Sequence, residues 1–301
     1  MRRLIFLILA LLAVVYCSGC AGTVDKQNDA AKKQSYVVQD VRGKKLSFES
    51  KPQKIISLYV YGDEVLLGLV DHKRIAGLSK WVHDDDLAMG AKEAKDVPQI
   101  AESNPEAILA LKPDLVLLPD SSKPEQISSL EDVGIKVFVY PAASRLSNIP
   151  KTIKAIGGAV GEPEQAEKLI AEMQKKISAV EAKVKKMQPE DRKKGLLFLR
   201  FGAIGGKGII FNDIMTAAGV EDCYEAARHT IADKPGTSRI LSKEEVVQAN
   251  PDYIIIGTWS QGGAYKAGNA QLEELYADPA LATVTAVKKK QAIVIPQGYV
   301  N

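Results

Sequence analysis

The chain has 301 residues, room for two domains, and its 46% hydrophobic and 26% charged residues are ordinary for a soluble globular protein rather than a disordered one. The formal net charge is +3. The first nineteen residues contain Arg2 and Arg3 but no acidic residue, so without them 38 basic side chains face 37 acidic ones. Such a balance excludes the basic surface that nucleic-acid binding needs, and we expect no nucleic-acid partner.

Residues 1–20 form a targeting segment. Two arginines precede the apolar run 4–15, which is too short to span a membrane and is typical of a secretory signal peptide. The end of the segment, Ser18-Gly19-Cys20, resembles the lipobox of bacterial lipoproteins, although Cys17 stands where that motif usually has Leu. The resemblance implies export, with Cys20 carrying the lipid that holds the protein to the extracytoplasmic face of a membrane. The polar residues 21–35 would then form a tether.

A first α/β lobe is predicted for residues 36–150. Alternating residues on either side of Arg42-Gly43 indicate a hairpin of two short edge strands. Apolar strand-like runs then alternate with helical segments, which predicts a parallel sheet with both faces covered. The predicted strands are 54–58, 74–78, 115–119 and 135–141, and the predicted helices are 62–70, 104–111 and 124–133.

A linker at 151–189 contains one long helix, from Pro163 to Met187. Its apolar residues recur every three or four positions and share one face. Proline suits the first turn, and Pro189 suits a stop just beyond the end. A surface helix or a dimerising coiled coil is the alternative, but the pattern lasts under four heptads. We interpret the helix, about 37 Å long, as a rigid spine between two lobes and expect a monomer that closes only slightly.

A second α/β lobe is predicted for residues 190–301. The predicted strands are 195–201, 252–256 and 291–296, and the predicted helices are 213–218, 243–249, 272–275 and 280–287. Glu106 precedes Pro113-Asp114 by seven residues, and Glu244 precedes Pro251-Asp252 by seven. This shared spacing favours two lobes of similar build. The fold class is therefore α/β, with two Rossmann-like lobes of parallel sheet joined by a single long backbone helix.

Two segments of the sequence partly match catalytic or nucleotide-binding motifs, but neither match is complete. Residues 202–208 resemble a phosphate loop, but the glycine spacing is short and Gly208 replaces the Ser or Thr that holds Mg²⁺. We interpret this segment as a flexible turn. Ser260 is not in a hydrolase elbow, because Thr258 occupies the first glycine position.

The sequence also offers few histidines and cysteines for a metal site or a disulfide. The three histidines are scattered, which disfavours a multi-histidine metal site or a Ser-His-Asp triad. His83 and the three aspartates after it are interpreted as a solvated acidic loop rather than a cation site. Only Cys223 remains after the targeting segment, so no disulfide framework exists. We predict no catalytic residue, no resident metal and no cofactor.

Aromatic and basic residues follow the predicted strands. Ligands of parallel α/β sheets collect beyond the carboxyl ends of the strands, and two facing lobes make a cleft there. Each residue alone is as compatible with packing or plain surface as with ligand contact. As a set they favour a flat, partly anionic ligand, with arginine forking a carboxylate or a chelated oxygen. They are Tyr59, Tyr61, Trp81, Tyr140, Arg200, Arg239, Trp259, Tyr265 and Tyr299.

Three runs of sequence carry a family resemblance: KPQKIISLYVYGDEVLLGLVDHKRIAGLS, DVPQIAESNPEAILALKPDLVLLP and ILSKEEVVQANPDYIIIG. In order, they closely resemble the substrate-binding lipoproteins of bacterial importers for iron–siderophore, haem and cobalamin, over residues 36–297. The resemblance implies two α/β lobes on one long helix, and delivery of the ligand to an ABC permease dimer with ATPase subunits. It also implies one surface glutamate per lobe that pairs with permease arginines, here Glu106 and Glu244.

The expected function is therefore capture of a metal chelate at a membrane. An iron–siderophore is the first expectation, cobalamin or haem is the alternative, and an extracytoplasmic α/β enzyme is the rival from another class. Family members usually continue past a strand like 291–296 into a further helix. Either the second lobe is trimmed or the sequence is truncated.

Overall fold

The computed structural model describes residues 35–98, 100, 104–199, 201–207, 210–223, 237–258 and 264–299. Two units are distinguished, residues 1–34 and residues 35–301, and the fold concerns the second. The predicted signal segment, Cys20 and almost all of the tether lie outside the described residues. Within the described ranges, no helix combines the length and apolar character that crossing a membrane requires.

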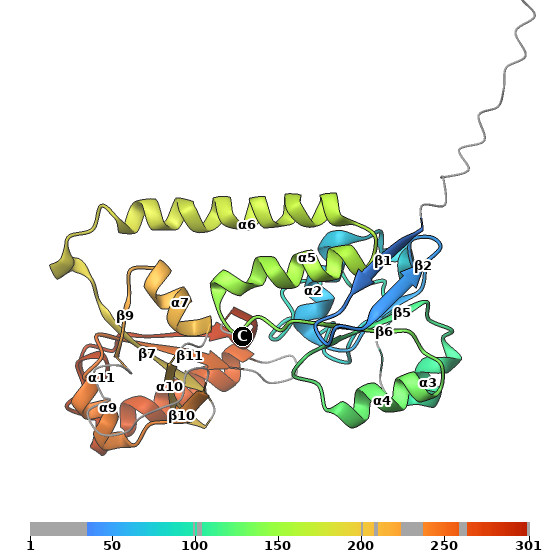
Figure 1. Cartoon of the computed structure of the whole chain (residues 1–301). Coiled ribbons are helices and arrows are strands. Elements are labelled where there is room, and N and C mark those ends of the chain that lie inside the picture. The colour runs from blue at the N-terminus through green and yellow to red at the C-terminus, as the bar shows by residue number, and fades with distance from the viewer. Residues whose placement is uncertain are drawn as a thin grey trace, which may run out of the picture. The chain divides into compact units, whose positions relative to one another are not determined.

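The first lobe contains the predicted hairpin and parallel sheet (Figure 1). The hairpin is antiparallel, with Tyr36 opposite Phe48, and the sheet strands run in the order β4-β3-β5-β6, all parallel. The strands are β1 (Tyr36–Gln39), β2 (Lys45–Phe48), β3 (Ile55–Ser57), β4 (Ile75–Gly77), β5 (Leu115–Pro119) and β6 (Val137–Tyr140). The helices are α2 (Val60–Leu69), η1 (His72–Arg74), α3 (Pro105–Ala110), α4 (Pro124–Asp132), η2 (Leu146–Asn148) and α5 (Ile149–Ala159).

Strand β5 shows why the sheet is buried on both faces. All five of its residues are buried. Leu115 and Leu117 pack into a cluster shared with α2 and α5, whereas Val116 and Leu118 pack into a second cluster with α3 and α4. The unbroken apolar run thus reflects helices on both faces of a parallel sheet, as predicted.

The long helix α6 spans Pro163–Val184, ending three residues before the predicted position. The preceding helix α5 was not predicted. It packs against α6, and a Cβ atom at Gly157 would lie 2.5 Å from the Cβ atom of Ala166, so glycine permits this close approach. Gly157 therefore serves the packing of the two helices.

The start of α6 is fixed to the first lobe by an ion-pair cluster. Glu162, the residue before the helix, lies 2.5 Å from an Arg74 nitrogen and 2.9 Å from Lys51 Nζ. Arg74 also donates to the backbone carbonyls of Pro52 and Val160. These bonds hold the first turn of the helix against the end of η1.

The second lobe contains a mixed sheet in the order β10-β8-β7-β11-β12, with β9 beside β7. Pairing among β7, β9, β11 and β12 is parallel, whereas β8 and β10 are antiparallel additions at one edge. The strands are β7 (Lys194–Leu199), β8 (Gly202–Lys207), β9 (Glu221–Asp222), β10 (Thr237–Ile240), β11 (Tyr253–Thr258) and β12 (Ala292–Pro296). The helices are η3 (Pro189–Asp191), α7 (Ile210–Ala217), α9 (Lys243–Ala249), α10 (Ala264–Ala277), η4 (Pro279–Leu281), α11 (Thr285–Lys288) and η5 (Gln297–Tyr299).

The interpretation of residues 202–208 as a flexible turn was wrong. Gly202–Lys207 form strand β8, which pairs with β7 on one side and with β10 on the other. Pairing on both sides satisfies the backbone groups of this glycine-rich segment, so neighbouring strands impose the conformation that local propensity does not. The predicted helix 272–275 is part of the longer α10, and the predicted helix 280–287 is divided between η4 and α11.

The two lobes repeat one local design. In each, a residue in the left-handed region, Lys112 (φ 51°) or Asn250 (φ 42°), precedes the Pro-Asp pair. Asp114 then accepts a hydrogen bond from the Lys54 backbone N–H, and Asp252 accepts one from Lys194, each at 2.9 Å. Each aspartate thereby fixes the start of the neighbouring strand, β3 or β7. The similar build expected from the sequence is confirmed at the level of hydrogen bonds.

Candidate functional site

Three tyrosines gather where strands of the first lobe end. Tyr59 follows β3 and directly precedes α2, Tyr61 lies in the first turn of α2, and Tyr140 is the last residue of β6. The Tyr59 and Tyr61 rings are 6.0 Å apart, and the Tyr61 and Tyr140 rings meet edge to face at 6.2 Å. The structure therefore brings together side chains up to 81 positions apart in the sequence at the carboxyl ends of parallel strands.

The members of this tyrosine cluster differ in exposure. Tyr61 is 42% exposed, and its hydroxyl lies 3.3 Å from Ser121 Oγ, beyond the end of β5. Tyr140 is fully buried, although the sequence placed it among the ligand contacts. Its ring contacts that of Tyr61 edge to face from a buried position, and all four residues of β6 are buried. Tyr61 is thus the exposed aromatic ring of the cluster, and Tyr140 is a buried residue that packs against it.

A buried carboxylate, Asp63, lies beside the cluster and was not predicted. It has no exposed surface, and its Oδ2 atom accepts a hydrogen bond of 3.1 Å from the Ser79 backbone N–H. Burial raises the pKa of Asp63 to about 7, with hydrogen bonds from the hydroxyls of Ser57 and Ser79 opposing the rise. Asp63 thereby joins the first turn of α2 to the segment after β4.

Trp81 lies in that segment. Its indole ring is partly buried, and the ammonium group of Lys80 lies 4.6 Å from the ring centroid. Further along, the Met89 N–H donates to Glu64 of α2 at 2.6 Å, which fixes the loop a second time. Burial raises the pKa of Glu64 as well. Asp63 and Glu64, adjacent acids of α2, therefore hold the helix that carries Tyr61 to the loop that carries Trp81.

The structure describes fewer of the predicted ligand residues in the second lobe than in the first. Arg200 and Trp259 lie outside the described residues, while Arg239 lies in β10 and Tyr265 in α10, without a described side chain. Tyr299, in η5, is 61% exposed. These ligand contacts stay predictions. One backbone hydrogen bond of 2.8 Å, from Gly298 N–H to the Asp86 carbonyl, connects this terminal segment to the loop that carries Trp81.

The two predicted docking glutamates are both exposed in the first turn of a helix. Glu106 lies in α3, whose cap is Asn104, since the Asn104 side chain accepts from the Ala107 N–H at 2.8 Å. Glu244 lies in α9, and there the adjacent Glu245 forms the capping box with Ser242. Glu244's own N–H and the Ser242 hydroxyl lower the pKa of Glu244. Neither helix therefore depends on its predicted docking glutamate for its cap, and Glu244 keeps its charge.

Side chains that could bind a metal ion are dispersed in the part of the chain that the structure describes. There, no three His, Cys, Asp or Glu side chains gather closely enough to hold an ion. Cys223 is buried and unpaired, and burial raises the pKa of its thiol to about 12. This thiol is a packing residue at neutral pH.

Residues 55–299 match the family model described as periplasmic binding protein. The chain belongs to this family. The match begins at β3 and ends in η5, so it includes both lobes, the long helix and both predicted docking glutamates.

Named relatives in the periplasmic binding protein family are similar over most of their length. YvrC of Bacillus subtilis, a substrate-binding lipoprotein of an ABC transporter, is 27% identical over 81% of this chain and 77% of its own. The vitamin B12-binding protein of Pectobacterium atrosepticum is 27% identical over 73% and 75%. The iron(3+)-hydroxamate-binding protein YxeB of Bacillus subtilis is 23% identical over 86% and 79%. Among solved structures, the heme binding protein HmuT has a TM-score of 0.67, with 22% identity over 92% of this chain and 87% of that one, which supports the fold.

Proposed function

We propose that this periplasmic binding protein captures a metal chelate outside the cell membrane and delivers it to an ABC permease dimer with ATPase subunits. An iron–siderophore is the first candidate ligand. The tyrosine cluster at the carboxyl ends of β3 and β6 carries the proposal, because it offers an exposed aromatic face where ligands of parallel sheets bind. The protein works as a monomer that Cys20 anchors to the membrane through lipid.

The chemistry of the first lobe suits a chelate. The ring of Tyr61 supplies a flat apolar face, while its hydroxyl and that of Ser121 supply polar atoms at its edge. Arg200 and Arg239 add the positive charge that an anionic chelate needs. A binding protein requires no more than such a surface, whereas an enzyme also requires a nucleophile or base with partners. The relatives named as binding proteins support the first class over an extracytoplasmic enzyme.

Cobalamin is the second candidate, and haem the third. The vitamin B12-binding relative covers 73% of this chain at 27% identity, a slightly higher identity than that of the hydroxamate-binding relative. A corrin ring and a siderophore both present broad surfaces to aromatic side chains, so the tyrosine cluster accommodates either.

A parallel titration tests the function directly. Trp81 and Trp259 are the only tryptophans, so binding at the proposed cleft should change the intrinsic fluorescence. We expect saturable quenching by one of three ligand types, ferric siderophores, cobalamin or haem, with a dissociation constant of about 1 μM or below. The chelates themselves absorb light. Binding of the best ligand is therefore also measured by equilibrium dialysis, which does not depend on fluorescence. Absence of saturable binding by all three would contradict the proposal.

Truncation of Tyr61 tests the site. Tyr61→Ala should weaken binding of the best chelate about fivefold to thirtyfold, because a stacked aromatic face contributes roughly 1–2 kcal/mol. Tyr253→Ala is the matched control, since Tyr253 is also partly exposed, at 37%, but begins β11 at the opposite end of a sheet. Equal losses in both variants, or none in Tyr61→Ala, would remove the tyrosine cluster from the site.

A further inference from the structure

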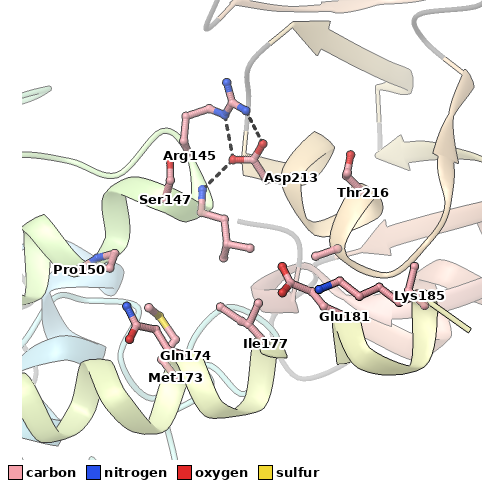
Figure 2. Close-up of a pocket in the computed structure, with 13 residues that line it drawn as sticks. Arg145, Ser147, Pro150, Met173, Gln174, Ile177, Glu181, Lys185, Asp213 and Thr216 are labelled. Carbon is pink, nitrogen blue, oxygen red and sulfur yellow. Dashed lines mark hydrogen bonds and ion pairs between the residues drawn. The ribbon is translucent and has the colours of Figure 1, made fainter. Parts of the chain in front are cut away.

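An arginine and an aspartate from different lobes form a two-pronged contact. Arg145 precedes η2 in the first lobe, and its Nε and Nη2 atoms donate to the two carboxylate oxygens of Asp213 in α7, at 2.8 and 2.5 Å. The Leu146 backbone N–H donates to the same carboxylate at 2.8 Å (Figure 2). The bonds from Arg145 lower the pKa of Asp213, so the carboxylate stays charged. We call this contact the clasp.

The clasp lies at the edge of a cavity of about 800 Å³. One wall is the inner face of α6, including Met173, Ile177 and Val184, and the facing walls are the segment that begins α5 and the helix α7 (Figure 2). The lining is largely apolar. Because the space is open, side-chain packing does not fix the distance between α7 and the first lobe at this place.

Helix α6 is packed into the first lobe over only part of its length. Ala166 and Ile170 are its buried residues, and both belong to the core of the first lobe. From residue 171 to its end no residue of the helix is buried. The outer half meets the second lobe through partly buried residues such as Val184, beside Gly219, so it limits the mutual angle of the lobes less firmly than a buried interface would.

We propose that the clasp positions the two lobes and thereby sets the affinity of the cleft without touching the ligand. A bidentate guanidinium–carboxylate pair fixes direction as well as distance, and the bond from Leu146 adds a third constraint. Without it, the lobes populate more angles and only a fraction suits a ligand held from both sides, which lowers the apparent affinity by that fraction. The affinity part rests on the proposed function, whereas the part on lobe position does not.

Charge reversal and charge exchange test the clasp. The variants are Arg145→Asp, Asp213→Arg and the two combined. The control is Glu167→Arg, which breaks the 2.8 Å ion pair with Lys154 between α5 and α6, inside the first lobe. All are made in the mature chain with Cys20→Ser, so that no lipid is attached, and circular dichroism confirms that each variant is folded.

Lobe position is read by spin labels on exposed residues of either lobe, at Ser128→Cys in α4 and Thr283→Cys before α11. Cys223 is buried and does not compete for the label. Either single reversal should broaden or shift the distance distribution, the exchange should narrow it again, and Glu167→Arg should leave it as in the parent. Single reversals that leave the distribution unchanged would overturn the proposal.

Affinity for the best chelate is measured on the same proteins. We expect a loss of about threefold or more in each single reversal, with recovery in the exchange. A distribution that shifts while affinity stays constant would overturn the part on affinity. If the parent binds none of the three chelate types, the proposed function fails, and the distance distributions still decide whether the clasp positions the lobes.

Discussion

Replacing both Glu106 and Glu244 by Arg is expected to abolish ligand-dependent stimulation of the permease ATPase while leaving folding and chelate affinity intact. Both glutamates are exposed in the first turn of helices α3 and α9, at matching places in the two lobes. A permease of paired subunits would offer two basic sockets, and complementary charges fix orientation and accelerate encounter. Reversal replaces two attractions by two repulsions. Vesicles that contain the permease complex, supplied with the loaded protein, provide the measurement.

The control for the docking prediction carries the same change of charge elsewhere. Glu125 is exposed in the first turn of α4, and Glu273 is exposed in α10. Glu125→Arg combined with Glu273→Arg should retain most of the stimulation. The docking assignment is wrong if both double variants behave alike, or if the Glu106/Glu244 variant loses chelate binding.

Asp63→Asn is expected to stabilise the protein at pH 8 by on the order of 2 to 4 kcal/mol and to leave it almost unchanged near pH 4. Asp63 is fully buried, and burial raises its pKa to about 7. An unfolded aspartate has a pKa of about 4. Between about pH 4 and 7 the folded state keeps a proton that the unfolded state has lost, so the free energy of unfolding falls by about 1.4 kcal/mol per unit of rising pH. Above the folded pKa that contribution is lost.

The amide removes this dependence because it stays neutral and still accepts the bond from Ser79. Urea unfolding from pH 4 to 8 gives the free-energy difference between variant and parent, in which the other titrating groups cancel. Asp132→Asn, at an exposed position at the end of α4, is the matched control and should show no such trend. A difference that does not grow with pH would show that Asp63 titrates normally.

Sequence reasoning succeeded where burial leaves a clear pattern. Strand β5 was predicted with its observed bounds because its five residues are all apolar or proline and a Pro-Asp pair precedes them. Helix α5 was missed because IPKTIKAIGGA contains a proline and two glycines, and the partner that makes Gly157 useful, Ala166, belongs to another helix. Strand β8 was missed because its glycines carry no alternation, and its neighbours impose its conformation.

The site shows the same division. That Tyr59 and Tyr61 follow the end of a strand was predicted from a local signal, and their place after β3 agrees with it. The burial of Tyr140 and Asp63 depends on the elements packed around them in the fold, and sequence spacing does not record that. Arg145 and Asp213 are 68 residues apart, on segments with no shared motif. Contacts of this kind follow from the assembled fold alone.

The core of the first lobe has a consequence for the order in which the chain folds. Its clusters draw on no described residue beyond Met173, which lies midway along α6. A chain that emerges with its N-terminus first, from a ribosome or a translocation channel, can therefore complete this core before the residues after Met173 have emerged. The remaining turns of α6 then form on a finished support. The second lobe, whose clusters begin at Leu196, assembles later as a unit of its own.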